Sequence, residues 1–461
     1  MKGAAALLAG ALCLIASGCR ARANSPEQAE AKAAASASAA LAVTADAHAR
    51  DAAAEDAAPD AEPAPRGPLN VLLILIDSLR YDMPWNGYSR PIAPFLTEYE
   101  KRVVSYTRAY TISSTTARSV APMLAGRYPS EMRRGGYFFT QWHPDNELLP
   151  ERLAEEGHAR FGVFAHTYFH AGTGVVQGLD PAKMLSGTVL NNLSPKHITS
   201  ERIALAARKL MSKPKIGDQS EGRRFFGYLH FMDPHAPYLA HEGRPSWGNR
   251  PRDLYDQEVH FTDEHVGKLI TWIKQQPFGE DTAIIITADH GESFGEHGHL
   301  KHGYELWEEL VRVPLFIDVP GAKPRRIDTP RSHIDLRRTI LELMNVSETA
   351  DTRGKSLVPE LFGAEPEPRV VVCDLPRDNL QDRRRAVIDG RYKMIGIGDD
   401  RRLLYFDVVA DPGETKRLNT EDPEGFERMR RVYEAVDKDI PVRDVSGDDP
   451  PLFNAPAGRR W

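Results

Sequence analysis

The run LNVLLILID, from Leu69 to Asp77, is almost continuously apolar and ends in a carboxylate. Gly67 and Pro68 precede it, and its length is that of a strand rather than of a buried helix. A strand that is apolar on both faces is typical of the interior of a parallel sheet. Similar runs follow at residues 159–165, 225–232 and 282–288. Helical patterns, such as the one over residues 253–274, lie between them, so the sequence predicts an α/β fold with a large, mostly parallel sheet flanked by helices.

Polar residues follow three of these predicted strands. Asp77 ends the first run, Asp233 and His235 follow the third, and Asp289 and His290 follow the fourth. The carboxyl ends of parallel strands share one edge of the sheet, where ligands bind. Aspartate is also common in ordinary turns, but three clusters of carboxylate and imidazole favour a site. Such donors suit a divalent cation: imidazole favours zinc or manganese, and oxygen-rich sets favour calcium.

The first 66 residues differ from the rest of the chain. Lys2 and an apolar run lead to Ala16-Ser17-Gly18-Cys19, which is similar to a lipobox and predicts a lipoprotein signal peptide over residues 1–19. An ordinary secretory signal is the alternative. Residues 20–66 are rich in Ala, Glu, Asp and Pro and predict a disordered tether. We therefore expect the protein in the bacterial cell envelope, anchored to a membrane by lipid at Cys19 and facing the periplasm or the exterior.

Net charge, cysteine content and the C-terminal strand pattern give three further predictions. A net charge of −6 without a long Lys/Arg block argues against a nucleic-acid partner. Cys373 has no partner for a disulfide once the signal is removed and Cys19 is acylated, so it is expected to be a small buried residue. Short strand candidates and one helical pattern follow residue 366 and predict a smaller antiparallel sheet plus helix over residues 366–461. The main domain is then residues 67–365.

Seven pieces of the chain, taken in order, resemble the sulfatase family of the alkaline phosphatase superfamily. They are ILIDSLRYD (74–82), TARSVAPMLAGRYPSE (116–131), LHFMDPHAPY (229–238), ADHGESFGEHGHLKHGYELWEELVRVPLFI (288–317), HIDLRRTILELMNV (333–346), RAVIDGRYKMI (385–395) and LLYFDVVADPGE (403–414). The resemblance implies an alkaline-phosphatase-like fold with the catalytic domain over residues 67–365. It also implies metal-dependent cleavage of anionic phosphoric or sulfuric esters, whether of small molecules, lipids or glycans.

The segment that carries the nucleophile in this family lacks its usual cysteine. Sulfatases that use formylglycine carry Cys-x-Pro-x-Arg, or Ser in place of Cys, ten positions before the glycine of a Thr-Gly-Arg-Tyr-Pro-like tail. Counting back ten positions from Gly126 gives Thr116, whereas alignment on Arg118 gives Ser114. Thr115 is a further alternative, and any of these hydroxyl residues could simply cap a helix. A helix start at this place could also hold an anion.

The resemblance assigns roles to particular residues. With a threonine nucleophile, it implies a phosphothreonine intermediate, as in lipid-headgroup phosphotransferases of bacterial envelopes, and we expect hydrolysis rather than transfer. His235 and His302 would contact the transferred group or protonate the leaving group. Arg118 and Lys301 would bind non-bridging oxygens of the substrate. One divalent ion (Zn, Mn or Ca) would be held by Asp77, Thr116, Asp289 and His290.

One departure from the family bears on the metal site. The usual sulfatase has two adjacent aspartates at the end of the first strand, and here the pair is Asp77 and Ser78. Asp82 could supply the missing carboxylate, although it belongs more naturally to the next loop. Two alternatives to a threonine enzyme stay open: a true sulfuric ester hydrolase (arylsulfatase-like) that uses Ser114, and a non-catalytic binding lipoprotein that keeps the sulfatase fold.

Overall fold

The computed structural model describes residues 67–185, 198–217, 223–399, 402–443 and 445. The predicted signal peptide with Cys19 and the predicted tether lie outside these residues. Among the helices of the described residues, none has the length and apolar character needed to cross a membrane.

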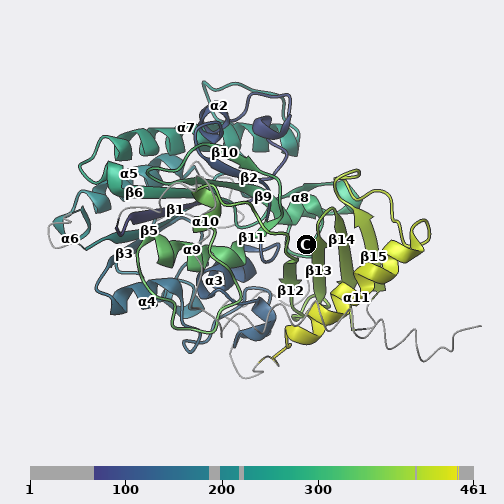
Figure 1. The fold of residues 1–461 in the computed structure, drawn as a ribbon. Helices are drawn as coiled ribbons and strands as arrows, with labels where there is room; N and C mark the ends of the chain where they lie inside the picture. Colours follow the sequence, from purple (N-terminus) through teal and green to yellow (C-terminus); the bar gives the residue numbers. More distant parts are fainter. Residues whose placement is uncertain (1–66, 186–197, 218–222, 400–401, 444, 446–461) are drawn as a thin grey trace, which may run out of the picture. The chain divides into compact units, whose positions relative to one another are not determined.

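A nine-stranded sheet forms the centre of the main domain (Figure 1). Its order is β10-β2-β9-β6-β1-β5-β3-β4, with β11 paired to β2. The strands are β1 (Asn70–Ile76), β2 (Val104–Tyr110), β3 (Ala159–Phe164), β4 (Ala182–Met184), β5 (Phe225–Phe231), β6 (Thr282–Thr287), β9 (Arg312–Asp318), β10 (Arg325–Ile327) and β11 (Arg331–Ser332). Within this sheet only β9 is antiparallel to its neighbours, which confirms the predicted, mostly parallel architecture.

Helices cover both faces of this sheet because successive side chains of β1 point to opposite faces. Leu72 and Ile74 belong to a core shared with α2 (Pro94–Glu100), α5 (Ser200–Met211) and α7 (Pro251–Lys274). Leu73 and Leu75 belong to a second core shared with α3 (Thr116–Ala125), α4 (Leu149–Glu155) and α9 (Leu336–Leu343). The apolar run that opens the main domain is therefore buried on both sides, as its composition predicts.

A second, four-stranded antiparallel sheet follows along the chain. It consists of β12 (Val371–Leu375), β13 (Arg384–Asp389), β14 (Tyr392–Ile397) and β15 (Arg402–Asp407). Met429 and Tyr433 of α11 (Pro423–Asp439) pack with Met394 against one face of this sheet. On the other face, Cys373 is buried and unpaired, as expected, in a core shared with Leu310 of the main domain.

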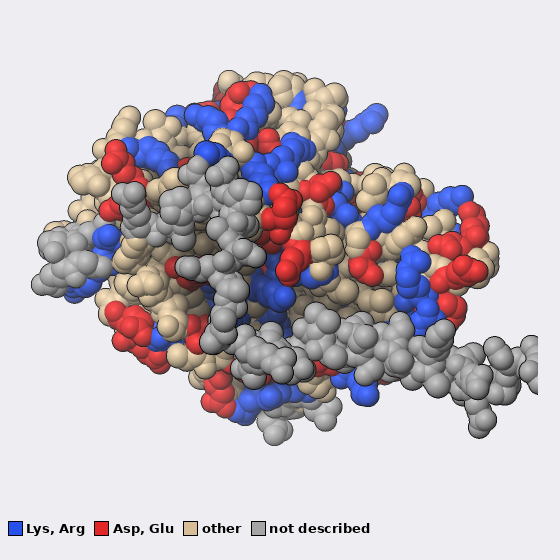
Figure 2. Space-filling view, viewed as in Figure 1, with Lys and Arg blue, Asp and Glu red and all other residues tan. Residues whose placement is uncertain are grey.

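The shorter elements lie in connections. A two-stranded hairpin joins β7 (Ser293–Phe294) to β8 (Leu300–Lys301), and the short helices are α6 (Pro214–Gly217), α8 (Glu308–Val311) and α10 (Val358–Leu361). The sequence analysis predicted the strands at β1, β3, β5 and β6 and missed β2 and β9. Figure 2 shows positive and negative side chains intermingled on the face in view, with no large region of one sign.

Candidate active site

Two pairs of parallel strands bring polar residues to one edge of the large sheet. β1 lies between β5 and β6 and is parallel to both. Asp77 follows β1 directly, and Asp289 and His290 come shortly after β6. Ligand atoms of these three residues lie within 4.8 Å of one another, and all three residues are buried. The structure thus brings together the carboxylates and the imidazole that the sequence analysis singled out at these strand ends.

The imidazole of His290 is oriented by its own loop. Nδ1 lies 2.9 Å from the carbonyl oxygen of Gly291, so Nδ1–H donates to that carbonyl and Nε2 keeps its lone pair. Nε2 lies 3.4 Å from Oδ2 of Asp289 and 3.6 Å from Oδ1 of Asp77. The tautomer that this contact selects is the one in which Nε2 can act as a metal ligand.

The start of α3 places a hydroxyl beside this cluster. Thr115 is the N-cap of the helix, and its side chain accepts a hydrogen bond from the backbone N–H of Arg118. Thr116 is the first helical residue, and its Oγ1 lies 3.2 Å from Nε2 of His290. Capping and proximity to the cluster are therefore divided between two adjacent threonines. Oγ of Ser114 is buried and has no hydrogen-bond partner.

Asp77 is held by a histidine that the sequence analysis missed. His230, on β5, lies with Nε2 2.9 Å from Oδ2 of Asp77, while its Nδ1 lies 2.8 Å from the hydroxyl of Tyr228. Burial by itself would raise the pKa of Asp77, but His235, His230 and His290 outweigh burial and hold that pKa well below its usual value. A polar residue inside the otherwise apolar run of β5 was the signal that could have identified His230.

Ser78 replaces the second aspartate of the family and contacts both carboxylates. Its hydroxyl donates to Oδ1 of Asp77 at 3.0 Å, and its backbone N–H lies 3.4 Å from Oδ1 of Asp289. Ser78 has a φ of 60°, which a residue other than glycine seldom adopts, so the surrounding contacts hold a strained backbone in place. Ser78, at the position where the family has a second aspartate, thus orients the two candidate ligands Asp77 and Asp289.

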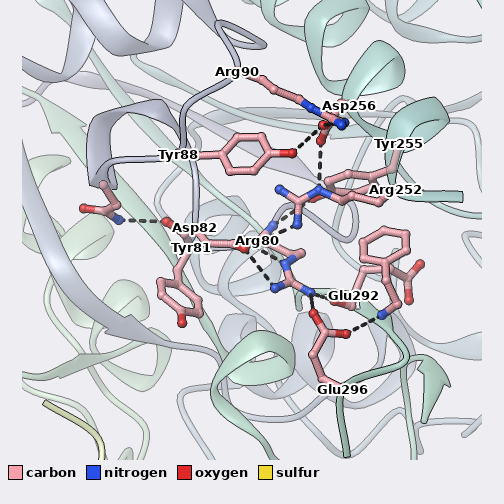
Figure 3. A network of polar contacts seen from close by, with 12 residues as sticks. Arg80, Tyr81, Asp82, Tyr88, Arg90, Arg252, Tyr255, Asp256, Glu292 and Glu296 are labelled. Atoms are coloured by element: carbon pink, nitrogen blue, oxygen red, sulfur yellow. Dashed lines mark hydrogen bonds and ion pairs between the residues drawn. The ribbon is translucent and has the colours of Figure 1, made fainter. Parts of the chain in front are cut away.

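Asp82 does not supply the missing ligand. Figure 3 shows Asp82 facing Arg80 and Arg252, with Oδ1 2.7 Å from Nε of Arg80. Arg80 also donates to the backbone carbonyl of Glu292 at 2.6 Å and to Oε1 of Glu296 at 2.8 Å. This network joins the loop after β1 to the loop after β6, so Asp82 supports the site from outside the ligand cluster.

Further histidines lie in a row beside the cluster. The ring centroid of His302 is 4.0 Å from that of His290, and His235 is 5.0 Å from His302. Nδ1 of His302 donates to Oε1 of the buried Glu292 at 2.9 Å, and this contact fixes the orientation of the ring. His166, next in the row at 5.5 Å from His235, has its pKa lowered to about 3, chiefly by burial.

Asp233, from the polar cluster after the third predicted strand, has a structural role. Its carboxylate accepts hydrogen bonds from the backbone N–H groups of Thr199 and Ser200 at 2.5 and 2.6 Å. These residues begin α5, so Asp233 caps that helix. Of this cluster only His235 belongs to the row of histidines.

The two predicted anion-binding residues lie in different environments. Arg118 is buried, forms an ion pair with Asp378, and donates to Oγ1 of Thr140 at 3.2 Å. Its Nη1 is buried without a hydrogen-bond partner. Lys301 is exposed at the end of β8, and its ammonium makes no hydrogen bond or ion pair with any residue in the described ranges of the chain. Arg118 is therefore tied into a buried network beside the start of α3, while Lys301 reaches solvent.

The cluster fits a divalent metal ion. Oδ2 of Asp289 is buried and has no hydrogen-bond partner, which is costly for a carboxylate oxygen unless a cation satisfies it. Two carboxylates and the lone pair of His290 face one point, with Oγ1 of Thr116 beside them. Mixed oxygen and nitrogen donors of this kind suit zinc or manganese better than calcium.

The fold and the site define an ester hydrolase of the alkaline-phosphatase type, in which carboxylates, imidazole and a helix-start hydroxyl meet at the strand ends. The family model described as "Sulfatase" matches residues 69–346, more than half of the chain, and the model of the C-terminal part of N-sulphoglucosamine sulphohydrolase matches residues 295–438. The chain belongs to the sulfatase family of the alkaline phosphatase superfamily.

Two kinds of relative are similar over most of their length. Choline-sulfatase of Rhizobium meliloti (strain 1021) is 26% identical over 436 residues, which cover 78% of this chain and 84% of that protein. A solved 2-O GAG sulfatase has a TM-score of 0.66 at 19% identity, over 81% of this chain and 91% of its own. The phosphonate monoester hydrolase of Silicibacter pomeroyi has a TM-score of 0.64 at 19% identity, over 81% and 96%. At such identity the two structures support the fold alone.

Proposed function

We propose that this protein is a metal-dependent hydrolase of anionic phosphoric or sulfuric esters and that Thr116 is its nucleophile. The observation that carries the proposal is the position of Oγ1 of Thr116, which lies at the first residue of α3 and 3.2 Å from Nε2 of His290. The helix start offers free backbone N–H groups and a favourable dipole to an anionic ester. The adjacent cap is supplied by Thr115, so Thr116 is available for chemistry.

One divalent ion, which could be zinc, manganese or calcium, would be held by Asp77, Thr116, Asp289 and His290. When bound, it supplies positive charge that lowers the pKa of a hydroxyl and neutralises charge on the ester. His230 and Ser78 keep Asp77 oriented toward this point. The unpartnered oxygen of Asp289 supports the same assignment.

The chain's own residues account for a two-step hydrolysis. Oγ1 of Thr116 loses its proton to water and forms a bond to phosphorus or sulfur, while the bond to the alcohol oxygen breaks. His302, with Nδ1 committed to Glu292, is placed to give the departing oxygen a proton from Nε2, and His235 lies next to it. Water then cleaves the adduct, releases phosphate or sulfate and restores the threonine.

The names of the relatives are consistent with both sulfuric and phosphoric ester substrates. A choline-sulfatase and a 2-O GAG sulfatase are named for sulfate esters, and a phosphonate monoester hydrolase is named for a phosphorus ester. A threonine favours phosphorus, because it cannot be converted to formylglycine. A sulfuric ester hydrolase that uses Ser114 is the second candidate, and the buried, unpartnered hydroxyl of Ser114 beside the helix start favours it.

Replacement of Thr116 tests the proposal. Thr116→Ala should abolish turnover of paired sulfate, phosphate monoester and phosphodiester substrates, because the attacking oxygen is removed, and Thr116→Ser should retain part of it. Thr115→Ala is the matched control: it should cost about 1 kcal/mol of stability through the lost cap and still turn over substrate. Mass spectrometry after acid quench should find an adduct on Thr116. Full activity of Thr116→Ala, or formylglycine at Ser114, would contradict the threonine nucleophile and favour the sulfuric ester hydrolase that uses Ser114.

We also propose that the mature protein is lipidated at Cys19 and held on a membrane of the cell envelope. The lipobox-like sequence before Cys19 and the acidic, Ala-rich residues 20–66 support this location. Cys19→Ser should move the protein from the membrane fraction to the soluble fraction of cells, as followed by immunoblot. Retention of Cys19→Ser in the membrane would contradict the anchor.

A further inference from the structure

An aromatic cluster lies next to the proposed nucleophile. The ring of Phe138 stacks on Tyr304 with centroids 5.6 Å apart and meets Phe139 edge-on at 5.3 Å. Gly303, between His302 and Tyr304, touches both the cluster and the helix start: a Cβ added there would lie 2.8 Å from Cγ2 of Thr115 and 2.9 Å from Phe138. The cluster thus meets Gly303, which directly follows the proposed acid His302 and borders Thr115, the residue before Thr116.

Several apolar side chains of this region face solvent. Phe139 and Tyr304 are each 37% exposed and Leu380 is 58% exposed. These three are among only nine large hydrophobic residues that are exposed in the described part of the chain. Phe138, Phe139, Tyr304 and Leu380 are called the apolar rim below. Apolar surface gathered beside a site is the usual mark of a ligand-binding area.

Polar side chains of the loop between β12 and β13 form hydrogen bonds that support the apolar rim. Asn379 accepts the backbone N–H of Phe138 at 3.0 Å, and Nε2 of Gln381 donates to the carbonyl of Gly303 at 2.8 Å. Asp378 pairs with Arg118. A loop of the second sheet therefore uses these polar groups as supports for the rim.

We propose that the apolar rim is a subsite for the alcohol half of the ester and that this half is an alkyl or aryl group. The inference rests on the proposed function, because it assigns the group that leaves from an ester bound at Thr116. Phe138 of the rim lies across Gly303 from Thr115, the residue before Thr116, and Gly303 directly follows His302, so the rim borders the place where the departing oxygen and its substituent must lie. Burial of that substituent against the exposed rings would remove apolar surface of both partners from water.

A set of esters that share the anion and differ in the alcohol tests this subsite. Hexyl phosphate should exceed methyl phosphate in kcat/KM by about tenfold, since even one or two buried methylenes have this effect. Glycerol phosphate should fall below hexyl phosphate, although its neighbouring hydroxyl makes glycerol the better leaving group. The same series of sulfates serves if the enzyme cleaves sulfuric esters. Equal values for hexyl and methyl esters, or a preference for glycerol or sugar esters, would overturn the proposal.

Variants of the apolar rim connect the preference to these residues. Phe139→Ser and Leu380→Ser, both at exposed positions, should lower the hexyl-to-methyl ratio severalfold. Leu205→Ser is the matched control, because Leu205 is 54% exposed on α5 and lies away from the rim in the sequence and in the fold. An unchanged ratio in both rim variants would contradict the assignment.

A binding measurement separates this inference from the proposed function. Calorimetry with hexylphosphonate and methylphosphonate needs no turnover, because neither compound has an ester bond. Tighter binding of hexylphosphonate by the full chain, weakened in Phe139→Ser, would support the rim even if every ester were left intact, and the proposed hydrolysis would then be the part that fails. Equal binding of the two phosphonates would overturn the rim whatever the turnover.

Discussion

At the scale of single residues, Asp77 and Asp289 set the character of the site. Both carboxylates are fully buried, and water does not offset their mutual repulsion. Histidines surround Asp77 and hold its pKa low against the effect of burial, so the carboxylate stays ionised. Oδ2 of Asp289 has no donor. A buried carboxylate oxygen without a donor is costly unless a cation satisfies it, which is why the ligand set predicts metal dependence.

The metal content of Asp289→Ala tests this prediction. The wild-type chain should carry about one divalent ion, and removal of one of four contacts should release most of it from the purified protein, as measured by elemental analysis. Asp82→Asn is the matched control, because Asp82 pairs with Arg80 outside the ligand cluster, and it should keep its metal. Wild-type metal content in Asp289→Ala would remove Asp289 from the site.

At the scale of elements, a buried histidine joins the large sheet to the segment before α9. Nε2 of His333 lies 2.8 Å from Oγ1 of Thr287 at the end of β6, and that hydroxyl donates to the carbonyl of Pro314 on β9 at 2.6 Å. His333 therefore donates to Thr287. Burial lowers the pKa of His333 to about 3. Protonation of His333 would put a second proton on a fully enclosed ring, so this junction is stable only with neutral imidazole.

The pH dependence of stability follows from this shift. The pKa of His333 in the folded state lies below its unfolded value of 6.5, so the folded state binds fewer protons. Its contribution is complete above pH 6.5 and is lost as the pH falls toward 3, by up to about 1.4 kcal/mol per pH unit. The free energy of unfolding, measured in urea, should fall less steeply for His333→Gln than for the wild type between pH 6.5 and 4.5. His143→Gln, at a partly exposed position where the side chain is 38% exposed, is the control and should keep the wild-type slope.

At the scale of the whole described unit, the second sheet is tied to the main domain through buried charge. Lys393 on β14 is fully buried, with Nζ 3.1 Å from Oε1 of Glu308 and 3.0 Å from Oε1 of Glu414. Burial by itself would lower the pKa of Lys393, but Glu414 and Glu308 outweigh burial and raise it. The loop between β12 and β13 carries Asp378, which pairs with Arg118 on α3, two residues after the proposed nucleophile Thr116. The second sheet is therefore part of the active-site support.

Replacement of Lys393 should destabilise the protein strongly. Lys393→Met leaves two buried carboxylates without their cation, and breaking such a group typically costs about 3–5 kcal/mol in the free energy of unfolding. Lys416→Met is the control, because Lys416 is exposed and pairs with Glu421 at the surface, and it should leave the urea midpoint unchanged. A Lys393→Met midpoint equal to wild type would show that this buried charge group does not stabilise the protein.

The sequence by itself determined the elements whose signals are local. The run that became β1 could only be a strand buried on both faces, and the runs at β3, β5 and β6 followed the same reasoning. Ordered motifs indicated the family, which the comparisons confirmed. The sequence analysis missed β9 although its run from Val313 to Ile317 is apolar, and the antiparallel direction of this strand depends on the path of the chain rather than on composition. Thr116 as nucleophile, and the roles of His235, His302 and Lys301, stay predictions.

Only the tertiary structure decided which distant residues meet. Thr116 lies 174 positions from His290 and Arg118 lies 260 positions from Asp378, and no local pattern encodes such pairs. Their proximity results from the strand order of the large sheet and from the docking of the second sheet upon it. The partner of Asp77 on β5, the division of roles between Thr115 and Thr116, and the apolar rim are all products of that arrangement. Residue types fixed the chemistry that the chain could offer, and long-range packing fixed where its parts come together.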